Sequence, residues 1–94
     1  MLSKIPNEIL DQSQDKTDMQ IIRAAIIAEL DAVNLYEQLI ANTKSDDITK
    51  VMESITGEEK THIAELETIL IKLDEEQLTQ LTTGEEEVNN LLSE

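Results

Sequence analysis

The sequence predicts an all-α protein whose main element is an antiparallel hairpin of two long helices. Its 94 residues include only two Gly and one Pro, so turn signals are few. It has no Phe or Trp and one Tyr, so any core is aliphatic, as in helix bundles. In two long segments the apolar residues recur at alternating steps of three and four, which is the period of an amphipathic helix.

The first helix is expected to begin at Thr17 and to end at Ala41 or Asn42. Thr17 and Gln20 fit a capping box, in which each side chain satisfies a free backbone N–H of the first turn. Residues 1–16 are mixed in character and are interpreted as an N-terminal arm. The apolar positions that define the helix are Met19, Ile22, Ile26, Val33 and Ile40.

A polar connection at 42–46 leads to the second helix, which Ser45 or Asp46 caps and which ends near Leu73. Gly57 lies in its interior, where Gly is unfavourable by about 1 kcal/mol relative to Ala. We therefore expect a packing reason for Gly57, such as the close approach of another helix. The apolar positions of this helix are Ile48, Met52, Ile55, Leu66, Ile69 and Leu73.

The segment 74–81 is expected to be a short helix or a turn. Thr83 and Glu86 fit a second capping box, so a separate short helix or tail is predicted over 83–94. Pieces this short are unstable unless they dock on something. The expected organisation is an arm at 1–16, the helical hairpin at 17–82 and a short C-terminal helix at 83–94.

The formal net charge of −14 limits the possible partners. Nucleic-acid binding relies on Lys and Arg at the phosphates, so a nucleic-acid partner is excluded, and an anionic membrane surface is disfavoured. A negative field concentrates cations, although an acidic surface also serves solubility alone. No Cys, secretion signal or span of about 18 apolar residues is present, so disulfides and thiolate sites are excluded and a cytoplasmic location is expected.

Ionisable groups interrupt both apolar seams at the same height. Glu29 lies 15 residues before position 44, in the expected connection, and Glu59 lies 15 residues after it, so the two carboxylates are level in an antiparallel hairpin. His62 is within one turn of that level. A carboxylate in a helix seam is costly to desolvate unless it is paired, protonated or bound to a metal.

One Glu plus a Glu-x-x-His pair is half of the ligand set of a di-iron carboxylate bundle. A second copy across a two-fold axis completes a four-helix bundle with four carboxylates, which balance the charge of two Fe(II) ions. Mn²⁺ and Zn²⁺ also accept Glu and His. Tyr36, seven residues from Glu29, either hydrogen-bonds a ligand or packs in the core, and Asp31 lies either on the path of incoming metal or in solvent.

The segments AELDAVNLYEQ (28–38) and GEEKTHIAEL (57–66) resemble the encapsulated ferritins, short ferritin-like proteins carried inside encapsulin shells. The likeness covers roughly residues 17–92. It extends through LDEEQLTQL and GEEEV, where the chain resembles versions of the domain that are fused to a shell protein. Two positions depart from the family pattern: Ala28 stands where an acidic residue is common, and Leu35 where Trp is common.

The resemblance implies that Glu29, Glu59 and His62 are iron ligands shared between two subunits and that Tyr36 is a tyrosine of the site. Ala28 leaves Asp31 as the remaining candidate for the path of incoming metal. The resemblance also implies a homodimer that assembles into an open ring, commonly a decamer, inside an encapsulin nanocompartment. No shell-targeting tail is recognised before Glu94, so the shell partner rests on the resemblance alone.

The function expected from these residues is a ferroxidase that oxidises Fe(II) to Fe(III) with O2 at a di-iron centre and passes the iron to a store. One alternative is a rubrerythrin-like peroxide reductase, which would need a separate electron donor because the chain has no Cys. Another is a non-catalytic helical oligomerisation module whose Glu and His are structural.

Overall fold

A computed structural model describes residues 13–93, and in that part of the chain the elements are three helices with no strand. They are α1 (Gln14–Asn42), α2 (Asp46–Leu73) and α3 (Glu75–Leu92). The predicted all-α fold is confirmed. None of these helices is both long and apolar enough to cross a membrane.

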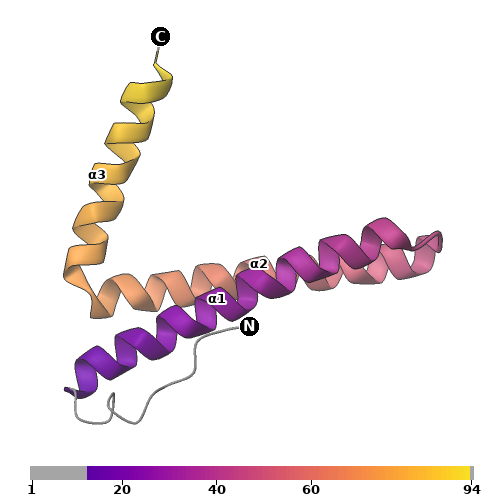
Figure 1. The fold of residues 1–94 in the computed structure, drawn as a ribbon, viewed down its shortest axis with the longest axis horizontal. Coiled ribbons are helices and arrows are strands. Elements are labelled where there is room, and N and C mark those ends of the chain that lie inside the picture. The colour runs from indigo at the N-terminus through magenta and orange to yellow at the C-terminus, as the bar shows by residue number, and fades with distance from the viewer. Residues whose placement is uncertain (1–12, 94) are drawn as a thin grey trace.

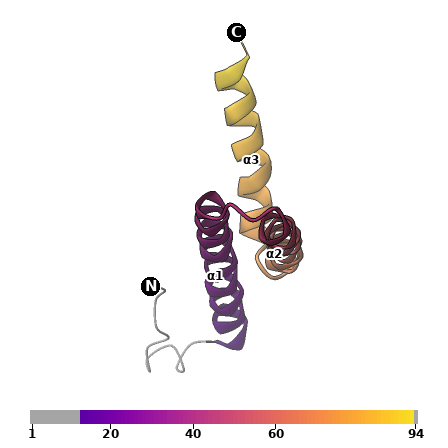
Figure 2. The same ribbon diagram turned by 90° about the vertical axis from the view of Figure 1, so that its right-hand side faces the viewer.

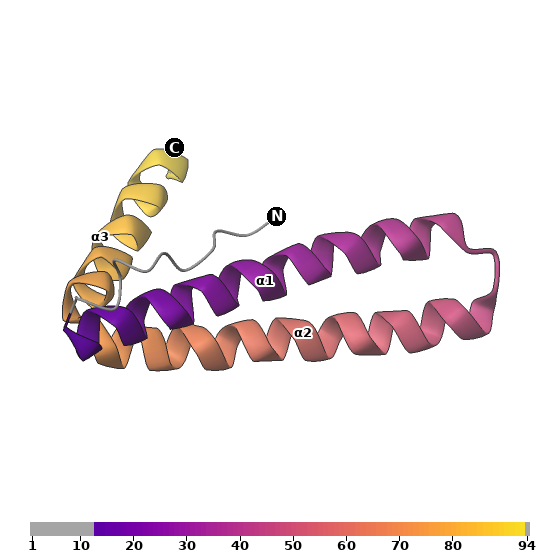
Figure 3. The same cartoon turned by 60° about the horizontal axis from the view of Figure 1, so that its bottom comes forward.

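Helices α1 and α2 run antiparallel side by side and form the predicted hairpin (Figures 1 and 3). The connection is residues 43–45, in which the Thr43 hydroxyl accepts from the Ser45 N–H at 3.1 Å. The Ser45 hydroxyl accepts from the Ile48 N–H at 3.2 Å and caps α2. The ends at Asn42 and Leu73 and the cap at Ser45 were all predicted.

The start of α1 differs from the prediction. The helix begins at Gln14, three residues before Thr17, because Ser13 provides the N-cap and its hydroxyl accepts from the Lys16 N–H at 3.3 Å. The Gln14 side chain also donates to Asp18 at 2.7 Å, an i to i+4 contact that strengthens the first turn. The expected arm therefore loses residues 14–16 to the helix, and residues 1–12 lie outside the described part.

The predicted break in the C-terminal segment was wrong. Helix α3 is continuous from Glu75 to Leu92, and Asp74 caps it by accepting from the Gln77 N–H at 3.1 Å. The Thr83 hydroxyl does not cap a new helix but donates to the Thr79 carbonyl at 3.2 Å, within α3. The segment 74–92 is one element.

The packing reason expected for Gly57 is not found within the described part of one copy. A Cβ built at this position meets no atom within 4 Å, and the residue is exposed. The expectation that another helix approaches Gly57 is left as a prediction about the assembly.

A single copy of the chain has little interior. Helix α3 leaves the hairpin at the C-terminal end of α2 and points away from it (Figures 1 and 2). The radius of gyration is 17.2 Å, whereas a compact domain of this length has about 12 Å. Among the described apolar side chains only that of Leu70 is buried, at 8% exposure. Most of the aliphatic surface is left for contacts with other molecules.

Candidate metal centre

The three side chains that the sequence singled out lie together in the middle of the hairpin. Glu29 comes from α1, and Glu59 and His62 come from successive turns of the same face of α2. One ligand atom from each lies within 4.8 Å of the other two. Across the described residues 13–93, no other group of three His, Asp or Glu residues is arranged in this way.

The contacts among the three are too long for good hydrogen bonds. His62 Nδ1 lies 3.5 Å from Glu29 Oε2 and 3.6 Å from Glu59 Oε2. Glu29 Oε2 is buried and has no hydrogen-bond partner. Nδ1 and two carboxylate oxygens thus converge on one point without satisfying one another.

The charges at this point are also uncompensated. The Glu29 and Glu59 side chains are 28% and 17% exposed, and neither forms an ion pair with a Lys or Arg among the described residues. Half-buried carboxylates facing one another are unfavourable unless a cation lies between them. A set of two carboxylates and one imidazole suits Fe, Mn or Zn, so these residues fit a divalent transition metal.

Two further predicted site residues lie outside this group. Tyr36 is half-buried and stands two turns, about 10.5 Å of helix rise, from Glu29. Asp31 is exposed and lies only two residues from Glu29, which turns it to a different face of α1. Within one chain, neither completes the ligand set.

The group opens toward an apolar face of the hairpin, and the sequence analysis named the apolar residues of this face on α2, but not those on α1, among the positions that define the helices. On α2, His62 belongs to a row with one member every seven residues: Ile48, Ile55, His62 and Ile69. On α1, a matching row contains Ile21, Ala28 and Leu35. Four of these apolar side chains, Ile21, Leu35, Ile48 and Ile69, are exposed.

The two rows lie on one side of the hairpin. Around its own helix axis, each row lies in the same rotational direction from the carboxylate of that helix, Glu29 on α1 and Glu59 on α2. Because the two helices are antiparallel, the same rotation on each helix turns both rows to the same side of the hairpin. His62, with 48% of its side chain exposed, stands on this side. We call this surface, made by the two rows, the site face; the seven-residue spacing was the sequence signal that could have revealed it.

Comparisons with known proteins identify relatives of this chain. The chain is 47% identical over 73 residues to a ferritin-like-encapsulin shell fusion protein of Pyrococcus furiosus, an alignment that covers 78% of this chain and 21% of that protein. It is 33% identical over 75 residues to the encapsulin nanocompartment cargo protein EncC of Myxococcus xanthus, covering 80% of this chain and 55% of that protein. The chain thus spans about a fifth of the length of the Pyrococcus furiosus protein and about half of the length of the Myxococcus xanthus protein.

A solved structure matches over nearly the whole length. The crystal structure of an encapsulated ferritin domain from Pyrococcus furiosus superposes with a TM-score of 0.82 at 38% identity, covering 95% of this chain and 94% of that one. The model of the EncFtn-like family matches residues 4–84, which include all three members of the metal-binding group. The chain therefore belongs to the EncFtn-like family.

Proposed function

We propose that this protein is a ferroxidase that binds Fe(II) between two copies of the chain and oxidises it with O2. The observation that carries the proposal is the buried, unpartnered Glu29 Oε2, which faces Glu59 and His62 across a space without a compensating charge. A divalent cation satisfies all three groups at once.

A second copy is needed because one hairpin supplies too few ligands. Glu29, Glu59 and His62 are three donors, and a two-fold partner on the site face doubles them to two imidazoles and four carboxylates. Four carboxylates balance two Fe(II) ions. The exposed apolar rows around His62 provide the contact area for that partner, and a ring of such dimers is the assembly that we expect.

The residues of this chain have distinct parts in the reaction. Glu29 and Glu59 would hold each ion by charge, and their attraction grows as the ion is oxidised, which favours the ferric product. His62 would bind through Nδ1 as neutral imidazole, leaving its proton on Nε2. A pair of ferrous ions held by these residues would supply two electrons, one from each ion, which with two protons from solvent would reduce O2 to hydrogen peroxide.

The store for the oxidised iron would be an encapsulin shell. Two relatives point in this direction, since one is named as a shell fusion protein and the other as a nanocompartment cargo protein. A hairpin with so little interior encloses no volume for mineral. We therefore propose that the protein acts inside such a compartment.

Iron oxidation in air tests the proposed activity. We expect the protein to form Fe(III) faster than buffer does, and Glu29→Ala, Glu59→Ala and His62→Ala to reduce the rate to that of buffer. Glu37→Gln is the matched control, because it removes an exposed carboxylate of α1 outside the group and is expected to keep the wild-type rate. Wild-type protein no faster than buffer, or three site variants as fast as wild type, would contradict the proposal.

Native mass with and without metal tests the shared site. Metal that bridges two copies binds only the assembled form, so Fe(II) under anaerobic conditions is expected to shift the population toward dimers and larger species. Glu59→Ala should abolish the shift and Glu37→Gln should not. A chain that stays monomeric at every Fe(II) concentration would rule out a site shared between copies.

A further inference from the structure

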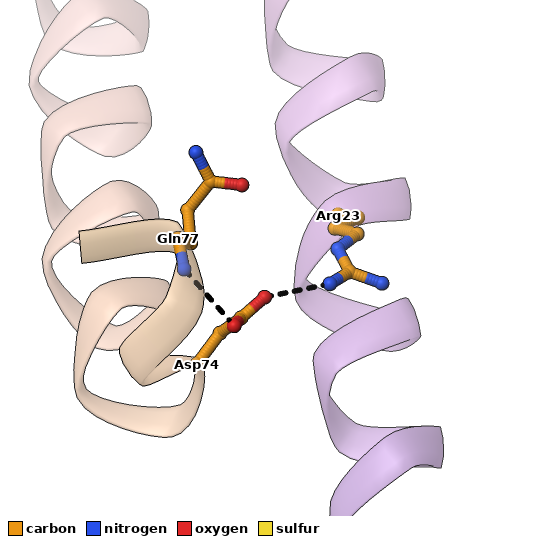
Figure 4. Close-up of polar contacts among 3 residues, drawn as sticks. All are labelled: Arg23, Asp74 and Gln77. Carbon is orange, nitrogen blue, oxygen red and sulfur yellow. Dashed lines mark hydrogen bonds and ion pairs between the residues drawn. The ribbon is translucent and has the colours of Figure 1, made fainter. Parts of the chain in front are cut away.

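Asp74 ties together all three helices at the corner of the molecule. Its Oδ1 accepts from the Gln77 N–H at 3.1 Å and caps α3, while its Oδ2 accepts from Arg23 of α1 at 2.7 Å (Figure 4). Its own backbone N–H donates to the Leu70 carbonyl at 2.9 Å and closes the end of α2. One residue thus ends one helix, begins the next and binds the third.

Little else holds α3 in its direction. Asp74 is the entire connection between α2 and α3, and α3 then points away from the hairpin (Figure 1). The Asp74 side chain is 14% exposed and the Arg23 side chain 46%, so solvent reaches the guanidinium but little of the carboxylate. In the described chain this pair is the only ion pair that links separate helices apart from the contacts of His62.

The direction of α3 matters because the helix carries an apolar face that a single chain leaves uncovered. The face consists of Leu78, Leu81, Val88, Leu91 and Leu92, all of them exposed. Gly84 lies within this face, and no atom stands within 4 Å of the place where its Cβ would be. We call this surface the α3 face.

A hollow continues the α3 face into the inner corner of the molecule. It is lined by Ile26, Glu67, Leu70 and Ile71 of the hairpin and by Gln77 and Leu81 of α3. Ile71 lies nine residues from His62, about half a turn around α2, so the hollow and the metal group are on opposite sides of the hairpin. The α3 face is therefore separate from the site face.

The amount of exposed surface indicates that a second copy covers the α3 face. Fourteen large apolar side chains of the described chain are exposed, five of them on the α3 face and four on the site face. A contact with one copy at the site face therefore leaves the α3 face uncovered, and a second contact is needed to remove it from water. A chain with two separate faces for its own copies closes into a ring or grows as a filament, depending on the angle between the faces.

We propose that the Arg23–Asp74 ion pair sets the direction of α3 and thereby selects which assembly the copies form. The pair fixes the angle between the α3 face and the site face, since Arg23 belongs to the hairpin and Asp74 begins α3. An ion pair that joins two elements and has a largely buried carboxylate can specify one arrangement among several of similar apolar area. The inference rests on the proposed function only in assigning the site face to one of the two interfaces.

The direction of α3 is measurable because the chain has no Cys, so two introduced cysteines report one distance. Spin labels at Lys44→Cys in the connection and Asn90→Cys on α3 are both at exposed positions. Labelled full-length chains are diluted with unlabelled ones so that distances within one copy dominate. We expect wild type to give a single narrow distance distribution.

Three substitutions separate the ion pair from the helix cap. Arg23→Gln removes the cation, and Asp74→Asn removes the negative charge while Asn still caps α3. Lys72→Gln is the matched control, because it removes an exposed cation of the last turn of α2 that forms no ion pair with another residue of 13–93. We expect Arg23→Gln and Asp74→Asn to broaden the distribution without loss of helicity, and Lys72→Gln to match wild type.

Native mass spectra of the same variants test the choice of assembly. Wild type and Lys72→Gln should form one dominant species, and the two ion-pair variants should spread over several, with the ratio of iron to chain unchanged. Wild-type distances or a single wild-type mass in both Arg23→Gln and Asp74→Asn would overturn the proposal. Failure of the ferroxidase proposal would appear instead as wild-type protein that forms Fe(III) no faster than buffer, a result on which these distances and masses do not depend.

Discussion

Glu29 is the residue whose surroundings are least favourable in a single metal-free chain. Its Oε2 is buried without a hydrogen-bond partner among residues 13–93, and ligand atoms of Glu59 and His62 lie within 4.8 Å. A structural carboxylate in a helix seam would have a Lys, an Arg or a backbone donor beside it. The absence of such a partner for this oxygen among the described residues is why we read the group as functional.

Replacing Glu29 should raise the stability of the metal-free protein while weakening its binding of metal. Carboxylate oxygens of Glu29 and Glu59 within 4.8 Å repel one another, so Glu29→Gln should stabilise the metal-free protein, by on the order of 1 kcal/mol. The same change should remove the stabilisation that Zn²⁺ gives, because a ligand is lost. Urea unfolding with chelator and with Zn²⁺ measures both effects.

The matched comparison is Glu37→Gln, which removes an exposed charge of α1. It should change the metal-free stability little and keep the full response to Zn²⁺. If Glu29→Gln destabilised the metal-free protein, Glu29 would have a structural partner that a single copy lacks.

The sequence was sufficient to predict that Glu29, Glu59 and His62 lie together, because the determinants of this arrangement are local. Equal spacing from the connection put Glu29 and Glu59 at one height, and a step of three put His62 beside Glu59. The roles of Tyr36 and Asp31 could not be derived in this way, since neither reaches the group within one chain. Their surroundings depend on the second copy, which a pattern along one chain does not describe.

At the scale of elements, the hairpin followed its sequence pattern and α3 did not. The pattern Thr83-x-x-Glu86 resembles a capping box, but a Thr hydroxyl inside a helix can instead donate to the carbonyl four residues earlier, as Thr83 does to Thr79. Asp74 already provides a cap nine residues upstream. Which of two possible caps is used depends on the helix that precedes them, and the sequence pattern alone does not decide between them.

Helix α3 should not be stable as an isolated peptide. It has Glu75 and Glu76 near its start and three consecutive acidic residues at 85–87, but no Lys or Arg, and its interior contains Gly84. With 18 residues α3 is only slightly longer than the about 12–15 residues below which even Ala-rich helices are marginal in water, and most helices depend on packing for stability. A peptide of residues 74–93 should therefore show little helicity by circular dichroism in buffer. Strong helicity in buffer would mean that α3 needs no docking.

Gly57 offers a test of what lies against α2 in the assembly. A Cβ at this position meets nothing within one chain, and Ala favours the helix over Gly, so Gly57→Ala should raise the unfolding free energy by about 0.5–1 kcal/mol. Gly84→Ala is the parallel case in α3. Urea unfolding and native mass should be measured together, because destabilisation or a smaller assembly in either variant would show that a neighbouring copy packs against that glycine.

The whole molecule combines a small apolar interior with a large negative net charge. The need for a partner could be predicted from the incomplete ligand set, but the direction of α3 could not. That direction depends on Arg23 and Asp74, which are 51 residues apart and carry no spacing signal. The apolar rows of the site face, in contrast, are visible in the sequence once their seven-residue period is sought.

The net charge should make assembly depend on salt in the absence of metal. Each copy carries a formal charge of −14, so two copies repel as their faces approach, and this repulsion is screened when the Debye length falls from about 30 Å at 0.01 M salt to about 10 Å at 0.1 M. Sedimentation in chelator should therefore show association that strengthens as NaCl rises.

Mg²⁺ at matched ionic strength is the control for metal binding, because it screens charge but prefers all-oxygen, octahedral sites to one with an imidazole. In wild type, Fe(II) or Zn²⁺ should promote association more strongly than NaCl or Mg²⁺ does. In Glu59→Ala, Fe(II) or Zn²⁺ should promote association no more than Mg²⁺ does. Association that weakened with NaCl would show that ion pairs, rather than the exposed aliphatic faces, hold the copies together.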